Sequence, residues 1–234
     1  MTDFPRSRRD LLAGGVTLAL AALVGCRRDD DSGELDVSAG EDLMREHGVL
    51  ERLIVVYDAA ARRLDAGDRS VQSAIGAAAR IAREFVEDYH ERIEERYVFP
   101  RFERANQLVE LVAVLRRQHD AGRGLTDHIA ALARGALASA ADRAELAAAL
   151  RGYGAMFVPH VGREDTLVFP AFHQLVGKEY ADLGDQFEDE ERARFGVGGF
   201  EQFVARLPAI EAAVGVADLA HFTVTVDDLA RSRS

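Results

Sequence analysis

In this chain of 234 residues, two similar segments each begin with a histidine followed four residues later by a glutamate. Residues 90–102 read HERIEERYVFPRF, residues 160–172 read HVGREDTLVFPAF, and the two segments align without a gap. A spacing of four places the imidazole and the carboxylate one turn apart on the same face of a helix. Imidazole and carboxylate together suit iron, manganese or zinc, so the repeated pair indicates a metal site.

The helices that position these pairs can be predicted from apolar residues spaced alternately three and four apart, because this spacing marks one face of a helix. We expect helices over residues 39–65, 70–104, 106–137 and 142–176. Each helix carries one histidine on its apolar stripe, and the second and fourth helices add a glutamate one turn later. These inward residues are His47, His90, Glu94, His119, His160 and Glu164.

The stripes of the third and fourth helices fix the direction of their histidines. The third stripe is Leu108, Val112, Leu115, His119, Gly122, Thr126 and Ile129. The fourth stripe is Leu146, Leu150, Tyr153, Phe157, His160, Glu164, Leu167 and Ala171. His128 lies nine residues after His119, half a turn out of phase, so we expect it to point away from the site.

A metal explains this set better than a hydrogen-bonded core does. A single histidine on an apolar face is usually a core residue with a hydrogen-bond partner, but here four helices each supply one. Two inward carboxylates without partners would each cost several kcal/mol, which a bound cation offsets. A bis-histidine haem would leave the glutamates unexplained, and the lack of nearby cysteine excludes a zinc-finger site. The residues therefore favour two metal ions inside a helical bundle.

Short connections between the four helices predict an all-α, up-down-up-down four-helix bundle over residues 39–177. Ser38 and Glu41 have the spacing of a capping box at its start. Residues 178–234 are expected to form a short helical appendage and tail. With a formal net charge of −11, the chain is not expected to bind nucleic acid.

Residues 1–25 have the pattern of an export signal, with basic residues before an apolar run too short to span a membrane. The Ser-Arg-Arg-Asp-Leu-Leu at 7–12 resembles a twin-arginine signal, and the Leu-Val-Gly-Cys that ends at Cys26 resembles a bacterial lipobox. An ordinary export signal with an incidental cysteine is the alternative. We expect an exported protein anchored to the outer face of a bacterial membrane by lipidated Cys26, with residues 26–38 as a flexible tether.

The order of these ligands, with both His-x3-Glu pairs leading into Phe-Pro, resembles the hemerythrin-like (HHE cation-binding) family. The resemblance covers about residues 39–177 and implies a four-helix bundle with a non-haem di-iron centre. In that family His47 and His90 would bind one iron and His119 and His160 the other, with Glu94 and Glu164 as bridges. Manganese and zinc are secondary candidates.

One departure from the family concerns the third helix. Oxygen-carrying hemerythrins have a second histidine four residues after the first one there, where this chain has Arg123. Glu91, which follows His90 directly, is the best substitute ligand. A water molecule or an exogenous ligand in that position is the alternative.

The resemblance implies binding or sensing of oxygen, nitric oxide or iron at the cell envelope. An oxidase- or peroxidase-type enzyme acting on oxygen or peroxide is an alternative, as is a metal-stabilised structural bundle. The sequence does not decide between catalysis and binding, and it names no protein partner.

Overall fold

A computed structural model describes residues 38–226 of the chain. The predicted export signal, Cys26 and the tether up to residue 37 lie outside the described residues. Within 38–226 the regular structure is helical throughout, without a strand, which confirms the predicted all-α class. In this part of the chain, no helix has the length and apolar character needed to cross a bilayer.

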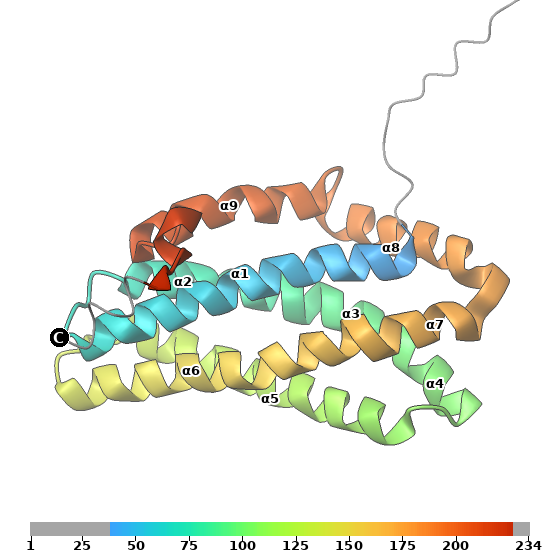
Figure 1. Cartoon of the computed structure of the whole chain (residues 1–234), viewed down its shortest axis with the longest axis horizontal. Coiled ribbons are helices and arrows are strands. Elements are labelled where there is room, and N and C mark those ends of the chain that lie inside the picture. The colour runs from blue at the N-terminus through green and yellow to red at the C-terminus, as the bar shows by residue number, and fades with distance from the viewer. Residues whose placement is uncertain (1–37, 227–234) are drawn as a thin grey trace, which may run out of the picture. The chain divides into compact units, whose positions relative to one another are not determined.

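Four long helical segments carry the residues singled out above, and Figure 1 shows them lying side by side. The first segment is the helix α1, Ala39–Asp65. The second runs without a break through α2 (Gln72–Ile81), η1 (Ala82–His90), α3 (Glu91–Ile93), η2 (Glu94–Val98) and α4 (Phe99–Ala105). The third is α5, Val109–Arg134, and the fourth joins α6 (Ala140–Arg163), η3 (Glu164–Val168) and α7 (Phe169–Val176).

The first segment begins as the sequence predicts. The backbone N–H of Ser38 donates to Glu41 at 3.1 Å, within the expected capping box. The capping box satisfies backbone donors that the first turn of a helix leaves without partners.

Wide π-helical turns follow both His-x3-Glu pairs, at η2 and η3. The proline that closes each repeat lacks an N–H for the carbonyl four residues earlier, and its ring crowds that carbonyl, so the turn before it widens. Such a turn holds one extra residue and shifts the phase of the helix. Leu167, predicted on the core stripe, is therefore 51% exposed, whereas Val168 is fully buried.

The third helix is shorter than the predicted range of 106–137. Asn106 and Leu108 have left-handed backbone conformations, with φ of 53° and 48°, so α5 begins only at Val109. Leu108 is 38% exposed and does not belong to the core stripe. The helix ends at Arg134, and Leu137 is again left-handed at φ 47°.

The long segments bury their apolar faces against one another. The helix α1 packs chiefly on α6, and α5 packs on α2 and α6. Midway along the bundle, the Tyr57 and Tyr153 rings meet edge to face with centroids 5.3 Å apart. These contacts hold the inner faces of the four segments at fixed positions.

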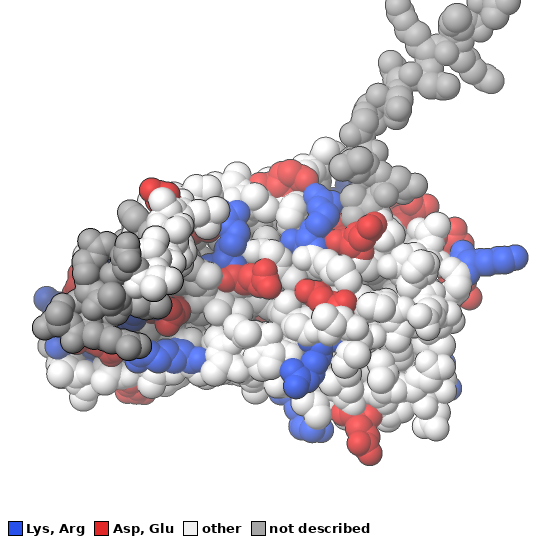
Figure 2. All heavy atoms as spheres, in the orientation of Figure 1, with Lys and Arg blue, Asp and Glu red and all other residues white. Residues whose placement is uncertain are grey.

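The C-terminal part adds the helices α8 (Tyr180–Phe195) and α9 (Gly199–Val214), with the short 3-10 turns η4 (Gly177–Glu179) and η5 (Leu219–Phe222). Both α8 and α9 pack against α1, and α9 also packs against α2. Phe203 of α9 lies 4.7 Å from Phe85 and 4.9 Å from Phe195, measured between ring centroids. On the face seen in Figure 2, acidic and basic side chains are interspersed.

Candidate metal centre

The four histidines and two glutamates predicted from the sequence meet in the core of the bundle. All six are at most 3% exposed. Their ligand atoms form two overlapping groups, each lying within 4.8 Å: Glu94, His119, His160 and Glu164 in one, and His47, His90 and Glu94 in the other. Since Glu94 belongs to both groups, the geometry suits two neighbouring cations.

Glu94 lies between histidines of different groups. Its Oε2 is 3.8 Å from Nε2 of His90 and 3.4 Å from Nε2 of His119. A carboxylate in this position can contribute to two cations at once.

Glu164 has the equivalent position on the other side. Its Oε2 is 3.4 Å from Nε2 of His47 and 2.9 Å from Nε2 of His160. The two repeats thus place their carboxylates symmetrically between the two pairs of histidines.

Each of the four histidines donates its Nδ1–H to an oxygen acceptor, which turns Nε2 inward. The pairs are His47 with Asp165 (2.7 Å), His90 with Glu46 (2.7 Å), His119 with Glu95 (3.1 Å) and His160 with Gln118 (3.0 Å). Such bonds fix the tautomer and the ring orientation of metal-binding histidines. The site therefore holds four Nε2 atoms ready to coordinate.

Two of these acceptors come from the repeat itself. Glu95 and Asp165 each follow the glutamate of a His-x3-Glu pair, and they align with each other in the two segments. Each orients the histidine of a helix outside its own repeat, His119 and His47 respectively.

Sequence reasoning assigned this role to none of the four acceptors, of which the other two are Glu46 and Gln118. They directly precede the histidines of the first and third segments, in Arg-Glu-His at 45–47 and Arg-Gln-His at 117–119. That second, shorter repeat was the available signal. The two halves of the bundle are thus related by an approximate two-fold pattern, in which the carboxyl group of Glu46 corresponds to the amide of Gln118.

Aromatic rings close the site where the repeats end. Phe99 stacks on His119, and Phe169 stacks on His47, each with ring centroids 5.4 Å apart and an angle of 28°. The phenylalanines of the two Phe-Pro endings therefore cap the histidines with apolar surface. His128, by contrast, is 48% exposed and pairs with Glu145 on the surface.

The electrostatics of the buried groups fit a cation. Burial and the negative charge of Glu164 raise the pKa of Glu94 well above its usual range. Burial disfavours a charged His47, yet the hydrogen bond that it donates to Asp165 and the negative charge of Glu164 raise its pKa to about 9. Among the described residues, the side-chain oxygens of Glu94 and Glu164 have no well-aligned donor. A metal ion would satisfy all four oxygens, so the donor set fits such a group.

Glu91 is buried at 1% exposure, which excludes a solvated helix face. Its Oε2 lies 2.8 Å from a guanidinium nitrogen of Arg123, and Arg123 also contacts Glu95 at 2.5 Å. Ligand atoms of Glu91, Glu95 and His119 lie within 4.8 Å of one another. Glu91 is therefore buried beside the second histidine pair, in contact with Arg123.

Further polar groups line the core beyond Glu91. Glu87, one turn earlier, is fully buried and contacts Arg83 at 2.7 Å. Burial raises the pKa of Glu87 above its ordinary value. The hydroxyls of Tyr57 and Tyr153 are buried and have no hydrogen-bond partner among the described residues. A polar layer therefore continues along the bundle from the candidate metal centre.

Known proteins match this chain over the region of the bundle. The model of the hemerythrin HHE cation binding domain family matches residues 38–172. Uncharacterized proteins of Mycobacterium tuberculosis and Mycobacterium bovis are each 44% identical over 233 residues, covering 92% of this chain and 90% of their own length. No solved structure matches the chain.

Proposed function

Because the chain belongs to the hemerythrin HHE cation-binding domain family, we propose that it is a non-haem di-iron protein that binds or senses oxygen, nitric oxide or iron. The observation that carries the proposal is the position of Glu94 and Glu164. Each carboxylate lies within 3.8 Å of histidines from both pairs. Two cations sharing these carboxylates would use every donor in the site.

Bound iron would supply redox chemistry and coordination positions for a small ligand, and the protein's own residues would control both. Phe99 and Phe169 exclude water from the histidine faces. Asp165 and Glu95 hold His47 and His119 in the tautomer that coordinates through Nε2. Manganese and zinc accept the same donors and are secondary candidates.

A second candidate is an oxidase- or peroxidase-type enzyme acting on oxygen or peroxide, and Arg123 favours it. This arginine stands where oxygen carriers have a histidine ligand, which leaves a coordination position to Glu91, water or substrate. Adding oxygen to the reduced protein separates the candidates. A stable, reversible change in absorption supports binding, whereas continued oxygen consumption supports an enzyme. A metal-stabilised structural bundle would show neither.

We also infer the arrangement and the location of the protein. Connections of a few residues between α1 and α2, and between α5 and α6, support the up-down-up-down order of the four long segments. The signal-like residues 1–25 and the lipobox at Cys26 support export and attachment to the outer face of a bacterial membrane. Radiolabelled palmitate on the wild-type chain, absent from Cys26→Ala, tests the anchor.

Elemental analysis of protein matured in its native compartment tests the metal assignment. We expect about two iron atoms per chain in the wild type. Glu94→Ala and Glu164→Ala should each lower that number, whereas the exposed His128 makes His128→Ala a matched control without effect. A wild-type protein free of iron, with no gain in melting temperature on adding it, would refute the assignment.

A further inference from the structure

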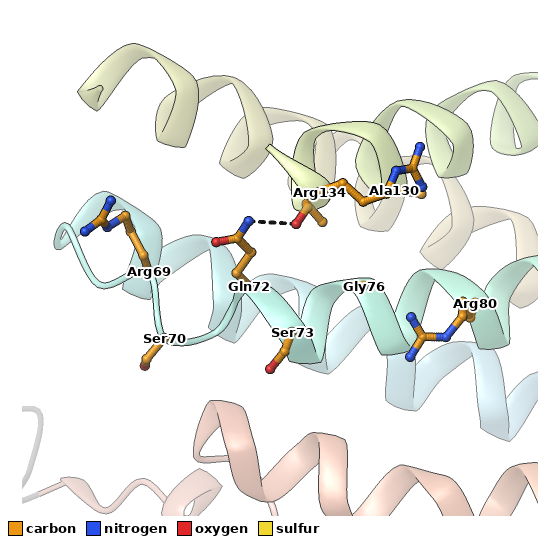
Figure 3. Close-up of a pocket in the computed structure, with 9 residues that line it drawn as sticks. Arg69, Ser70, Gln72, Ser73, Gly76, Arg80, Ala130 and Arg134 are labelled. Carbon is orange, nitrogen blue, oxygen red and sulfur yellow. Dashed lines mark hydrogen bonds between the residues drawn. The ribbon is translucent and has the colours of Figure 1, made fainter. Parts of the chain in front are cut away.

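A groove between α2 and α5 lies apart from the candidate metal centre and has a volume of about 620 Å³. Its lining, shown in Figure 3, comprises Arg69, Ser70, Gln72, Ser73, Gly76, Arg80, Ala130, Ala133 and Arg134. The side-chain amide of Gln72 donates to the carbonyl of Ala133 at 2.7 Å and joins the two helices across the groove. The walls are therefore held together by a direct contact between α2 and α5.

The charge of this groove is opposite to that of the chain. The whole sequence has 40 acidic and 29 basic residues, yet three arginines and no acidic residue line the groove. The guanidinium groups of Arg69, Arg80 and Arg134 have no ion pair, hydrogen bond or ring contact with any residue in 38–226. Most other arginines in this range pair with a carboxylate or a carbonyl, so three cationic groups without partners at one groove indicate an anionic ligand.

The smaller residues of the groove also suit an anion. A Cβ atom on Gly76 would lie 4.0 Å from Nη1 of Arg80, an ordinary contact, so the guanidinium of Arg80 lies close to the helix surface beside Gly76. Ser73 is exposed and presents a hydroxyl group that can donate to an oxyanion. The groove thus offers both charged and neutral donors.

We propose that this groove binds a ligand carrying several phosphate groups. A guanidinium binds phosphate oxygens with two parallel hydrogen bonds, so three of them can bind successive phosphates. The spacing favours an extended ligand, because Arg69 and Arg80 stand 11 positions apart. Arg69 lies in the loop before α2 and Arg80 near the end of that helix, so the two side chains start from opposite ends of the groove wall. A single small anion would contact only part of the groove.

Calorimetric titration of the full-length chain with tripolyphosphate, in an uncharged detergent and at low salt, tests the proposal. The triple variant Arg69→Ala/Arg80→Ala/Arg134→Ala should bind at least ten-fold more weakly than the wild type. Arg104→Ala/Arg117→Ala is the matched control, because these two exposed arginines also have no partner among the described residues but lie outside the groove. This control should bind within two-fold of the wild type.

Equal binding by the triple variant and the wild type overturns the proposal, as does the absence of wild-type binding at millimolar tripolyphosphate. Orthophosphate should bind at least ten-fold more weakly than tripolyphosphate. Equal affinities for the two would refute the proposal that the ligand carries several phosphate groups. Vesicles with and without phosphatidylglycerol show whether the phosphate groups belong to a lipid or to a soluble ligand. If the wild type but not the triple variant binds vesicles, and only those that contain phosphatidylglycerol, the ligand is a lipid headgroup. All three proteins retain the six candidate metal ligands and should hold the same amount of metal. An unchanged metal content before and after titration shows that the heat does not come from tripolyphosphate removing bound metal.

Discussion

Oε2 of Glu46 lies 2.7 Å from Nδ1 of His90, so the residue before one candidate ligand orients another ligand on a different helix. Gln118 has the same relationship to His160 at 3.0 Å, with a neutral amide in place of the carboxylate. The two halves of the site therefore have the same geometry but differ in the accepting group, a carboxyl at Glu46 and an amide at Gln118. A carboxylate partner makes an imidazole more basic than an amide partner does, so His90 should be the stronger donor to a metal.

Glu46→Ala should weaken metal binding by about 10- to 100-fold, the usual effect of removing a group that orients a ligand. Glu46→Gln should weaken it less, because the amide oxygen keeps the hydrogen bond while the charge is lost. Competition with a chelator measures the affinities. Glu51→Ala, an exposed change on the same helix, is the control and should match the wild type. Equal affinities for all three variants would show that Glu46 does not act on the metal through His90.

Arg123 and Glu91 should stabilise the metal-free protein as a pair. Breaking a buried pair by removing one partner costs about 3 kcal/mol or more, because the remaining charge is left uncompensated. Arg123→Met and Glu91→Gln should therefore each lower the free energy of unfolding in urea. The double variant should be more stable than the sum of the two changes predicts. Strictly additive effects would contradict the 2.8 Å contact between the two groups.

The same variants test whether Glu91 is a ligand. If Glu91 replaces the missing histidine, Glu91→Gln should lower the iron content toward one atom per chain. Arg123→Met removes only the competing cation and should keep both iron atoms. If Arg123→Met loses iron while Glu91→Gln keeps both atoms, Glu91 is not a ligand and has a structural role instead.

Metal binding should release protons at pH 7.5. The hydrogen bonds to His47 raise its pKa to about 9, and burial with the charge of Glu164 raises that of Glu94. His47 therefore carries a proton in the metal-free protein at this pH and must lose it to coordinate, and the raised pKa of Glu94 favours release in the same direction. Affinity should rise with pH until His47 is deprotonated, near pH 9.

Calorimetry of anaerobic iron(II) binding in two buffers with different ionisation enthalpies measures this release. Asp165→Asn removes one of the groups that raise the pKa of His47, so this variant should release fewer protons than the wild type. Identical heats in both buffers would show that the site holds no displaceable protons.

The candidate ligands could be predicted from the sequence because spacings of three and four place them on the buried face of each segment. The predicted inward side chains up to His90 and His160 are buried, even though η1 before His90 is itself π-helical. Beyond Glu164 the wide turn shifts the pattern by one residue, which exposes Leu167 and buries Val168. A prediction that assumes a uniform period has no means of including that extra residue.

The acceptors of the histidine Nδ1 atoms were harder to predict. Glu46 and Gln118 are polar residues beside a stripe, and the helical period alone assigns such positions to the boundary of the core. Their role depends on the lateral position of a neighbouring helix, which no local pattern encodes. Arg123 also points toward buried carboxylates rather than solvent, because Glu91 and Glu95 attract it from the adjacent segment.

Gly122 of α5 should be required for packing beside the candidate metal centre. A Cβ atom there would lie 2.6 Å from Cζ and 2.8 Å from Cε2 of Phe157, whose ring centroid is 5.2 Å from that of His160. Gly122→Ala should therefore displace the ring and destabilise the protein by about 1–3 kcal/mol, as overpacking of a core does.

Gly124→Ala is the matched control, two residues further along the same helix. A Cβ atom at Gly124 meets nothing within 4 Å. Alanine is favoured over glycine inside a helix by about 0.8–1.0 kcal/mol, so this variant should be slightly more stable than the wild type. Urea denaturation of the two metal-free variants compares them directly. The two changes should have opposite signs, because helix propensity acts alone at Gly124 but is outweighed at Gly122 by the contact with Phe157. Stabilisation by both would show that the Phe157 ring moves aside freely.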